Sequence, residues 1–335
     1  MTNFDIYGIG NALVDIEVNL TEKELTNTSL DKGVMTLIDE KTLHELVNSY
    51  TPNIVKKACG GSAANTIIGA SHMGANCYYS CKVANDKQGI FYIQDLTKNR
   101  VSTNSNINNL ETGITGNCFV CVTPDGDRTM ATFLGITSTF SKSDINFSVI
   151  DQSKYLYIEG YLVTSPSGKE AAVNSKQYAQ NNGVPTALSL SDPSVVSYFK
   201  NDFNDIIGSH IDILFCNEDE ALTFSGSKTI DDAILYLKKF CNHFIITQGA
   251  KGSLLFYQNK LTPFSAYATN VVDTNGAGDL FAGIYLGSIA KGMEPSLAIE
   301  MANFGSSILV SKFGPRLETE DYQNIQNKFN SVLNV

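Results

Sequence analysis

The sequence of 335 residues predicts an α/β fold with a doubly wound, mainly parallel sheet, helices on both of its faces, and a small β-sheet that acts as a lid. Strand-like and helix-like segments alternate through most of the chain, which is typical of βαβ units. Residues 13–39 and 112–135 break this pattern, because both are rich in alternating β-branched residues and neither precedes a helix of the βαβ kind. The lid is therefore expected to form from these two separated segments.

The alternating segments define the expected large sheet. Four apolar stretches that end in small or polar residues are predicted as buried strands: 154–162, 184–191, 210–217 and 243–250. Residues 168–181 and 229–241 are predicted as helices, because their apolar residues recur at spacings of three and four. Ligands of open parallel sheets bind beyond the carboxyl ends of the strands, so a site is expected just after these strands.

The domain organisation follows from the two unusual segments. We expect a large domain made of residues 1–11, 40–111 and 136–335, and a discontinuous lid domain made of residues 12–39 and 112–135. A lid at the carboxyl edge of the main sheet could close over a bound ligand.

Composition excludes several classes of partner. The net charge is −10, the isoelectric point is about 4.9, and no basic run interrupts this negative field, so neither nucleic acid nor a membrane is an expected partner. The N-terminus carries an acid where a signal peptide has basic residues, and no apolar run approaches the roughly 18 residues of a membrane span. We therefore expect a cytoplasmic protein, either a monomer or a homodimer, with its seven cysteines reduced.

Common catalytic and nucleotide motifs are absent from the sequence. No Gly-Lys-Ser/Thr triplet of a Walker loop occurs, and GIGNALVD contains only Gly8 and Gly10 of a dinucleotide fingerprint. A Gly-x-Ser-x-Gly nucleophile elbow is also missing. Four histidines are spaced for neither a triad nor a zinc site: His44, His72, His210 and His243. Hydrolase and zinc-enzyme functions are therefore disfavoured.

The stretch VVDTNGAGDLFAGIYLG, residues 271–287, predicts an anion site at the start of a helix. A helix N-terminus presents unpaired N–H groups, and Gly276, Ala277 and Gly278 allow a phosphate to approach them. The following helix is expected to pack through an apolar stripe of Phe281, Ile284, Tyr285 and Ile289.

Asp279 is unexpected in such a site, because a carboxylate repels an anion. Its position makes sense if it points at a substrate hydroxyl beside the phosphate and accepts the proton as that hydroxyl attacks. The alternative is a glycine-rich turn that carries a solvated acid at a helix start.

Four motifs, in the expected order along nearly the whole chain, resemble those of the ribokinase-like, or phosphofructokinase B, family of sugar and nucleoside kinases. They are GGSAANTIIGASHMG (60–74), NEDE (217–220), TQGAKG (247–252) and DTNGAGD (273–279). The resemblance implies an ATP-dependent phosphotransferase with Asp279 as base and Gly276, Ala277 and Gly278 as anion hole. It also implies ATP and Mg²⁺ as cofactors, and it leaves open a monovalent cation such as K⁺.

Further roles are implied for the nucleotide and the metal. Thr247, Gly249, Gly252 and Asn303 would bind ATP, and Asn217 and Glu220 would hold Mg²⁺ through water. Taken alone, residues 217–220 would be a helix start and the two glycines would be turn residues.

The lid and the acceptor site are also implied by the family. Arg128, in GDRTM, resembles the family's lid arginine that reaches the transferring phosphoryl, although on its own it would be an exposed hairpin residue. The implied acceptor-binding residues are Asn11, Asp15, Gly60, Gly61 and Asn65. A carboxylate such as that of Asp15 accepts hydrogen bonds from two vicinal hydroxyls, which a ribose offers, but it could also be an exposed strand residue.

Within the family the chain most resembles the adenosine kinases, through GIGNALVDI, LSLSDP (188–193) and Asn275. One departure is Ser194, which stands where the animal enzymes carry an aromatic residue that stacks on the purine. Stacking would then fall to Tyr161, Leu134 or Met35. The expected reaction is phosphorylation of adenosine to AMP, and the alternative is a sugar kinase for ribose, fructose or a keto-deoxy acid. A catalytically inactive nucleotide-binding regulator is disfavoured by the intact Asp279, Asn217 and Glu220.

Overall fold

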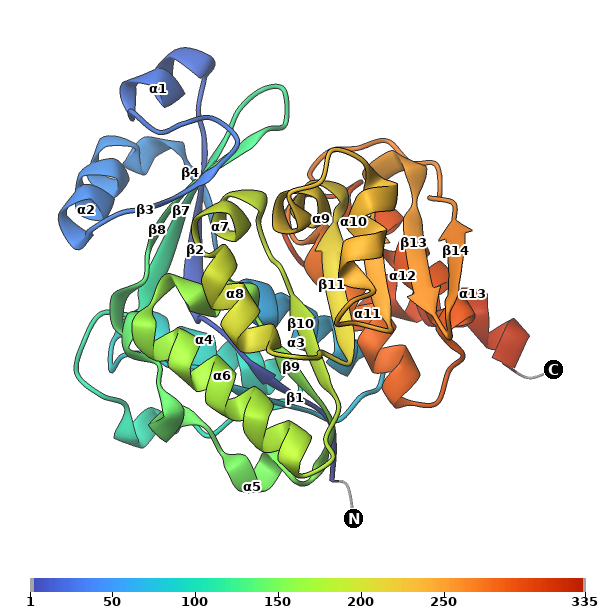
Figure 1. Cartoon of the computed structure of the whole chain (residues 1–335). Helices are drawn as coiled ribbons and strands as arrows, with labels where there is room; N and C mark the ends of the chain where they lie inside the picture. Colours follow the sequence, from blue (N-terminus) through green and yellow to red (C-terminus); the bar gives the residue numbers. More distant parts are fainter. Residues whose placement is uncertain (1–2, 334–335) are drawn as a thin grey trace.

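Figure 1 shows the computed structural model, which describes residues 3–333 and the side chains of residues 3–329. The ends of the expected large domain, residues 1–2 and 334–335, lie outside the described residues. In the described part of the chain, the strands form one large sheet of nine strands and one small sheet of five strands.

The large sheet is mainly parallel. Its strands are β1 (Phe4–Ile9), β5 (Cys77–Ser80), β6 (Val101–Ser102), β9 (Ser153–Ile158), β10 (Thr186–Ser189), β11 (Ile213–Asn217), β12 (Phe244–Thr247), β13 (Ser253–Tyr257) and β14 (Lys260–Phe264). They are arranged in the order β14-β13-β12-β11-β10-β9-β1-β5-β6. Pairing is parallel from β6 to β12, and β13 and β14 extend that edge in antiparallel pairing.

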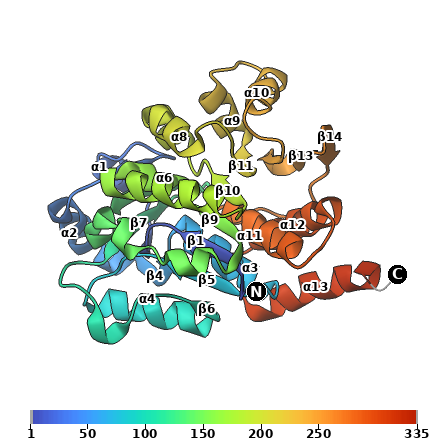
Figure 2. The same ribbon diagram turned by 60° about the horizontal axis from the view of Figure 1, so that its bottom comes forward.

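Helices cover both faces of this sheet (Figure 2). One layer contains α3 (Ser62–His72), α4 (Lys87–Lys98), α11 (Ala277–Ala290), α12 (Pro295–Leu309) and α13 (Thr319–Leu333). The other contains α5 (Phe147–Ile150), α6 (Pro166–Asn181), α7 (Pro193–Tyr198), α8 (Lys200–Ile207), α9 (Glu218–Ser225) and α10 (Ile230–Leu237). Successive strand residues point to opposite faces, as with Ile6 and Tyr7 of β1, which belong to the two different cores. The predicted doubly wound fold is confirmed.

The small sheet has the order β3-β8-β7-β2-β4. Its strands are β2 (Leu13–Asn19), β3 (Met35–Leu37), β4 (Ile54–Gly60), β7 (Gly116–Val122) and β8 (Arg128–Phe133). Two helices accompany it, α1 (Glu22–Asn27) and α2 (Glu40–Ser49). The sheet and these helices share a separate core, to which Ile16, Leu43 and Phe119 contribute.

This arrangement corrects the expected boundaries of the lid. The sequence places residues 40–111 in the large domain, but α2 packs on the small sheet and β4 pairs with β2 along its edge. β4 was missed because Val55, Lys56 and Lys57 are exposed in succession, so the strand shows no alternation of buried and exposed residues. The helix α1 was also missed, although Thr21 and Glu24 form a capping box at its start.

Short 3₁₀ helices complete the described secondary structure. They are η1 (Thr51–Asn53), η2 (Ile107–Asn109), η3 (Gly135–Thr139), η4 (Lys142–Asp144), η5 (Gly160–Thr164) and η6 (Gly249–Lys251).

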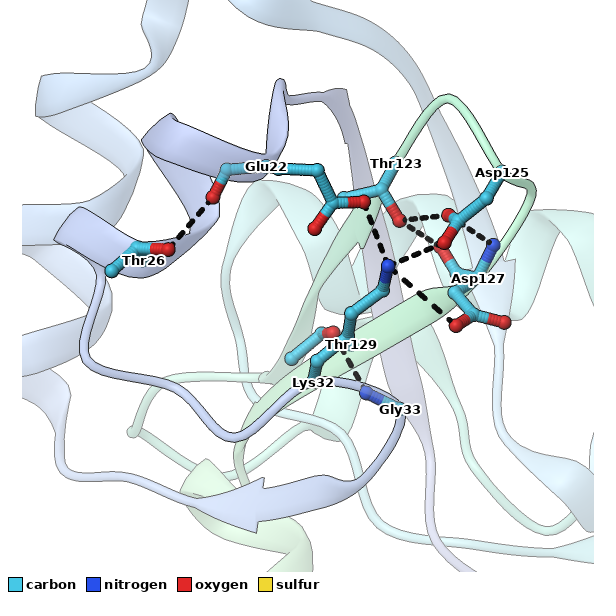
Figure 3. A network of polar contacts seen from close by, with 8 residues as sticks. All are labelled: Glu22, Thr26, Lys32, Gly33, Thr123, Asp125, Asp127 and Thr129. Carbon is cyan, nitrogen blue, oxygen red and sulfur yellow. Dashed lines mark hydrogen bonds and ion pairs between the residues drawn. The ribbon is translucent and has the colours of Figure 1, made fainter.

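Lys32 joins the two chain segments of the small sheet (Figure 3). Its Nζ donates to Glu22 at 2.7 Å and also bonds Asp125 in the turn between β7 and β8. Beside it, the N–H of Gly33 donates to Oγ1 of Thr129 at 3.0 Å. These contacts hold residues 28–34 against the β7–β8 hairpin, so the hairpin and β3 lie at fixed positions relative to each other.

The helix α11 is buried almost all round, which corrects the expectation of a single apolar stripe. Residues 280–288 are buried throughout, because α11 lies between α3 and α12 (Figure 2). Its N-terminus is thereby fixed at one place beside the sheet. Among residues 3–333, no helix has both the length and the hydropathy of a membrane span.

Candidate active site

A cavity of about 620 Å³ lies between the small sheet and the carboxyl ends of the large-sheet strands. Its wall combines residues of β2, β7 and β8 with the segments that follow β9, β10, β11 and β12. The cavity brings together most of the predicted site residues: Asn11, Asp15, Gly61, Asn65, Arg128, Asn217, Glu220, Thr247, Gly249, Gly276, Ala277, Gly278 and Asp279. Gly60, Gly252 and Asn303 are not among the residues that line it.

The N-terminus of α11 opens into the cavity. Gly276 has a φ of +72°, and a Cβ there would lie 2.5 Å from the carbonyl oxygen of Pro315, so both conformation and packing require glycine. Gly278 borders open space, and no described residue accepts a hydrogen bond from the N–H of Gly278 or Asp279. Two free N–H donors at the positive end of a helix dipole are suited to an anion.

Asp279 is held by two donors from α3. Ser62 Oγ donates to Oδ1 at 2.6 Å, and Asn65 Nδ2 donates to Oδ2 at 3.0 Å. Burial raises the pKa of Asp279, while the bonds from Ser62 and Asn65 and the charge of Arg316 oppose this rise. A hydrogen-bonded carboxylate in a cavity wall is a different environment from the solvated acid of the alternative interpretation.

Asn65, predicted to bind the acceptor, is thus also a partner of Asp279. Its Oδ1 accepts a bond of 2.7 Å from Nε of Arg316. Arg316 in turn forms an ion pair of 2.5 Å with Asp95 on α4. The carboxylate of Asp279 is therefore connected through Asn65 to a charged pair behind the cavity.

Asp15 points into the cavity from β2. The Asp15 side chain lies so close to residue 60 that only glycine fits there, because a Cβ at residue 60 would lie 2.2 Å from Oδ1 of Asp15. Asp15 is 7 % exposed, and among the described residues none donates a hydrogen bond to its carboxylate. Burial raises its pKa to about 7. A carboxylate without a protein donor is free to accept hydrogen bonds from the hydroxyls of a ligand.

Glu159 organises the first strand end and the start of α3. It follows β9 directly and is 1 % exposed. Its carboxylate accepts the N–H of Asn11 and, at 3.4 Å, the N–H of Ala63. Burial raises the pKa of Glu159 to about 8, although these backbone bonds oppose the rise. Gly61, with a φ of +92°, is the N-cap between Gly60 and this helix. Glu159 therefore fixes the backbone around two predicted acceptor-binding residues, Asn11 and Gly61.

Asn217 and Glu220 form a capping box at the start of α9. Glu220 N–H donates to Oδ1 of Asn217 at 2.8 Å, and Asn217 Nδ2 donates to Oε1 of Glu220 at 2.7 Å. Burial raises the pKa of Glu220 to about 8. Both side chains line the cavity, so the helix start and the predicted metal position coincide. Among the described residues, no three His, Cys, Asp or Glu side chains gather into a metal cage.

The predicted ATP residues occupy two different environments. Thr247, at the end of β12, and Gly249 line the cavity. Gly252 supports the turn before β13, since its φ is +103° and a Cβ would lie 2.0 Å from the carbonyl oxygen of Phe264. Asn303 is buried on α12, where its Nδ2 donates to Oγ of Ser253 at 3.0 Å. Gly252 and Asn303 therefore support β13 at the cavity's edge rather than face the cavity.

Arg128 joins the small sheet to the loop of residues 273–276 that precedes α11. Its guanidinium forms a bidentate ion pair with Asp273, the first acid of DTNGAGD, and Nη1 lies 3.5 Å from Oε1 of Glu17. The Arg128 side chain is only 7 % exposed, which contradicts the interpretation as an exposed hairpin arginine. The guanidinium of Arg128 is thus held against the loop that leads into α11.

Both the small sheet and the large domain contribute apolar residues to the cavity wall. Met35, Leu134 and Tyr161, which the sequence offers for stacking, all line the cavity, together with Val120 and Met130. Ser194 presents no surface for stacking, because both its N–H and its hydroxyl donate to Oδ1 of Asp192 at the start of α7.

Sequence reasoning missed four residues of this site: Ser62, Glu159, Asp273 and Arg316. Glu159 was missed because the predicted strand 154–162 runs past it, whereas β9 ends at Ile158 and Glu159 follows it directly, at the edge where ligands of such sheets bind. Asp273 and Ser62 lie inside quoted motifs, but which partners they have depends on long-range packing. Arg316 lies in FGPRL (313–317), and nothing in that short sequence indicates a site.

Comparison with known proteins identifies the family. Residues 26–321 match the profile of the pfkB family carbohydrate kinases. An adenosine kinase from Saccharomyces cerevisiae is 26% identical over 93% of this chain and 96% of its own length. The structure of an adenosine kinase from Sinorhizobium meliloti superimposes with a TM-score of 0.91 at 30% identity, covering 97% of this chain and 99% of the other. A probable sugar kinase protein from Rhizobium etli gives a TM-score of 0.92 at 28% identity, covering 98% and 99%. The family profile spans most of the sequence, and the shared fold places the family motifs around one cavity; the chain belongs to the pfkB family of carbohydrate kinases.

Proposed function

We propose that this protein transfers the γ-phosphoryl group of ATP to the hydroxymethyl group of a ribonucleoside, and that adenosine is the acceptor, converted to AMP. The observation that carries the proposal is the placement of Asp279 in the first turn of α11, where it lines the same cavity as Asp15 and the apolar residues of the small sheet. The kinase activity follows from the family, whereas the acceptor and the role of Asp279 are our inference. The adenosine kinases among the similar proteins support this choice of acceptor.

In this mechanism Asp279 accepts a proton from the acceptor hydroxyl. The hydroxyl oxygen forms a bond to the γ-phosphorus, the bond from that phosphorus to the β–γ bridging oxygen breaks, and ADP leaves. The N–H groups of Gly278 and Asp279 donate to the transferring phosphoryl, and the dipole of α11 stabilises its charge. Ser62 and Asn65 fix the carboxylate so that one oxygen lone pair can face the attacking hydroxyl.

The residues around Asn217 and Glu220 fit a magnesium ion that arrives with the nucleotide. Mg²⁺ keeps several waters and is usually bound by one or two carboxylates plus substrate phosphates, so a dedicated cage is not required. Glu220 lines the cavity with a carboxylate whose pKa burial raises, and a nearby cation would favour its charged form. Bound there, the ion would neutralise charge on the phosphates during transfer.

The acceptor site combines one carboxylate with an apolar surface. The Asp15 carboxylate has no donor among the described residues and can accept bonds from the two vicinal hydroxyls of a ribose, and Asn11 lines the same cavity. Met35 and Leu134 would then cover the base. This division suits a nucleoside, which is polar at the sugar and flat and less polar at the base.

A sugar kinase is the second candidate, and Ser194 is the observation that favours it. A chain that binds a purine is expected to place an aromatic ring against it, but Ser194 is a small residue engaged with Asp192. The similarity to a probable sugar kinase protein points the same way.

The test is a turnover panel. Wild-type protein with ATP and Mg²⁺ is offered adenosine, guanosine, inosine, ribose, fructose and a keto-deoxy acid, and ADP release and the phosphorylated product are measured. We expect AMP from adenosine at the highest kcat/KM, and no product from Asp279→Asn beyond a small residual rate. ADP release without any phosphorylated acceptor would contradict the proposed function.

A further inference from the structure

The segment Gly314-Pro315-Arg316, between α12 and α13, contacts three parts of the site at once. The N–H of Gly314 donates to Oδ2 of Asp273 at 2.7 Å. Pro315 packs so closely on Gly276 that a Cβ there would clash with it. Nε of Arg316 donates to Oδ1 of Asn65 at 2.7 Å. One short segment outside the family motifs therefore joins the loop that precedes α11 to a partner of the base.

Arg316 is held firmly in place. Its side chain is 17 % exposed, and its Nη1 pairs with Oδ2 of Asp95 at 2.5 Å. Its Nη2 is buried without a partner among the described residues, so the guanidinium gives up one hydrogen bond in this position. Because Arg316 does not line the cavity, it acts on a ligand only through its neighbours.

The chemistry of the amide explains what Arg316 does to Asn65. An asparagine side chain has an accepting oxygen at one end and a donating NH₂ at the other, and a rotation of 180° exchanges them. Arginine only donates, so the atom of Asn65 that faces Nε of Arg316 must be the oxygen. The NH₂ group must then face Oδ2 of Asp279. An ionised carboxylate can accept hydrogen bonds but cannot donate them. Without Arg316, the amide could turn and place its oxygen against the carboxylate.

We propose that Arg316 is a positioning residue for the base, which fixes the amide of Asn65 so that Asn65 donates to Asp279. The inference rests on the proposed function, in which Asp279 is the base. It assigns a role to a residue that touches neither the acceptor nor the nucleotide.

The kinetic test is a double-mutant cycle between Arg316 and Asn65, measured with the best acceptor of the panel. Arg316→Lys keeps the charge but lacks the planar fork in which Nε bonds Asn65 while Nη1 pairs with Asp95. It should lower kcat about tenfold and change KM for ATP by less than about twofold, because ATP does not contact it. In the Asn65→Ala background the same change should cost less than about twofold in kcat, because the residue through which it acts is gone. Losses that multiply independently would overturn the proposal.

The second test needs no acceptor, so it separates this inference from the proposed function. The side-chain NH₂ signals of Asn65 are assigned by ¹⁵N NMR through their loss in Asn65→Ala. In the wild type they should exchange slowly with solvent, and Arg316→Lys should speed this exchange by about tenfold or more. Unchanged exchange would overturn the proposal even if turnover fell. If the wild type phosphorylates nothing on the panel, the proposed function fails and this measurement still decides the role of Arg316.

Lys82→Gln is the matched control in both tests. Lys82 is also a largely buried cation, 12 % exposed, and it pairs with Glu111 and Asp144 away from the cavity. Lys82→Gln should change neither kcat nor the rate at which the side-chain NH₂ protons of Asn65 exchange with solvent. Arg316→Lys and Lys82→Gln should both retain native circular dichroism, which excludes general unfolding as the cause.

Discussion

Arg128 of the small sheet and Asp273, in the loop that precedes α11, form a bidentate ion pair, although 145 residues separate them in the sequence. Oδ1 of Asp273 also accepts the N–H of Asn275 at 2.9 Å, and Oδ2 accepts the N–H of Gly314 at 2.7 Å. The carboxylate therefore connects the lid to the loop that leads into α11. Any displacement of the lid must act on this pair.

Replacing Arg128 by alanine should lower kcat by about tenfold or more, with a smaller effect on the KM of the acceptor, because a cation beside the transferring phosphoryl acts mainly in the transition state. Steady-state kinetics measure this. Lys32→Ala is the control, since it removes exposed ion pairs of the same lid outside the cavity. A change confined to KM would make Arg128 a binding residue, and an equal loss in Lys32→Ala would point to a general loosening of the lid.

Asp279→Asn should lower kcat by on the order of 10²-fold while ATP binding stays nearly intact, because the proton acceptor is lost and the N–H groups at the helix start remain. Calorimetry with a non-hydrolysable ATP analogue measures the binding. Asp202→Asn serves as the control, because Asp202 pairs with Lys169 outside the cavity. Near-normal turnover of Asp279→Asn would contradict the assignment of Asp279 as the general base.

The buried carboxylate of Asp15 should make the stability of the ligand-free protein depend on pH. Its pKa rises to about 7 through burial, whereas an unfolded Asp titrates near about 3.9. Between these values the folded state holds a proton that the unfolded state has lost, so the free energy of unfolding should fall as the pH rises from about 4 to about 7. Asp15→Asn should lose less stability over this range, which urea unfolding at several pH values measures. Parallel pH profiles for the wild type and Asp15→Asn would show that Asp15 is not held in this environment.

The large sheet and the position of the cavity could be predicted from the sequence because both depend on local patterns. Apolar runs that end in polar residues mark strand ends, and parallel strands bring those ends to one edge. Residues 154–162 and 210–217 illustrate this, since the first overlaps β9 and includes Glu159, and the second contains β11 and ends at Asn217.

The contacts that complete the site could not be predicted, because they join distant segments. Ser62 and Asp279 are 217 residues apart, and Arg316 reaches Asn65 across 251 residues. No spacing rule within either segment encodes such a pair. The edge strand β4 was missed for a different reason: its successive exposed residues show neither a helical nor a strand period.

The most direct test of the central claim compares adenosine with free ribose by thermal unfolding. Burial of the purine against the lid should supply most of the binding energy, since sugar hydroxyls exchange water for protein partners at little net gain. Adenosine at a hundred times its Kd should stabilise the folded state by about 2.7 kcal/mol, whereas ribose at the same concentration should give almost no shift. Asp15→Ala should abolish the adenosine shift. A ribose or fructose shift that equals or exceeds that of adenosine, with phosphorylation to match, would contradict the account and identify a sugar as the acceptor.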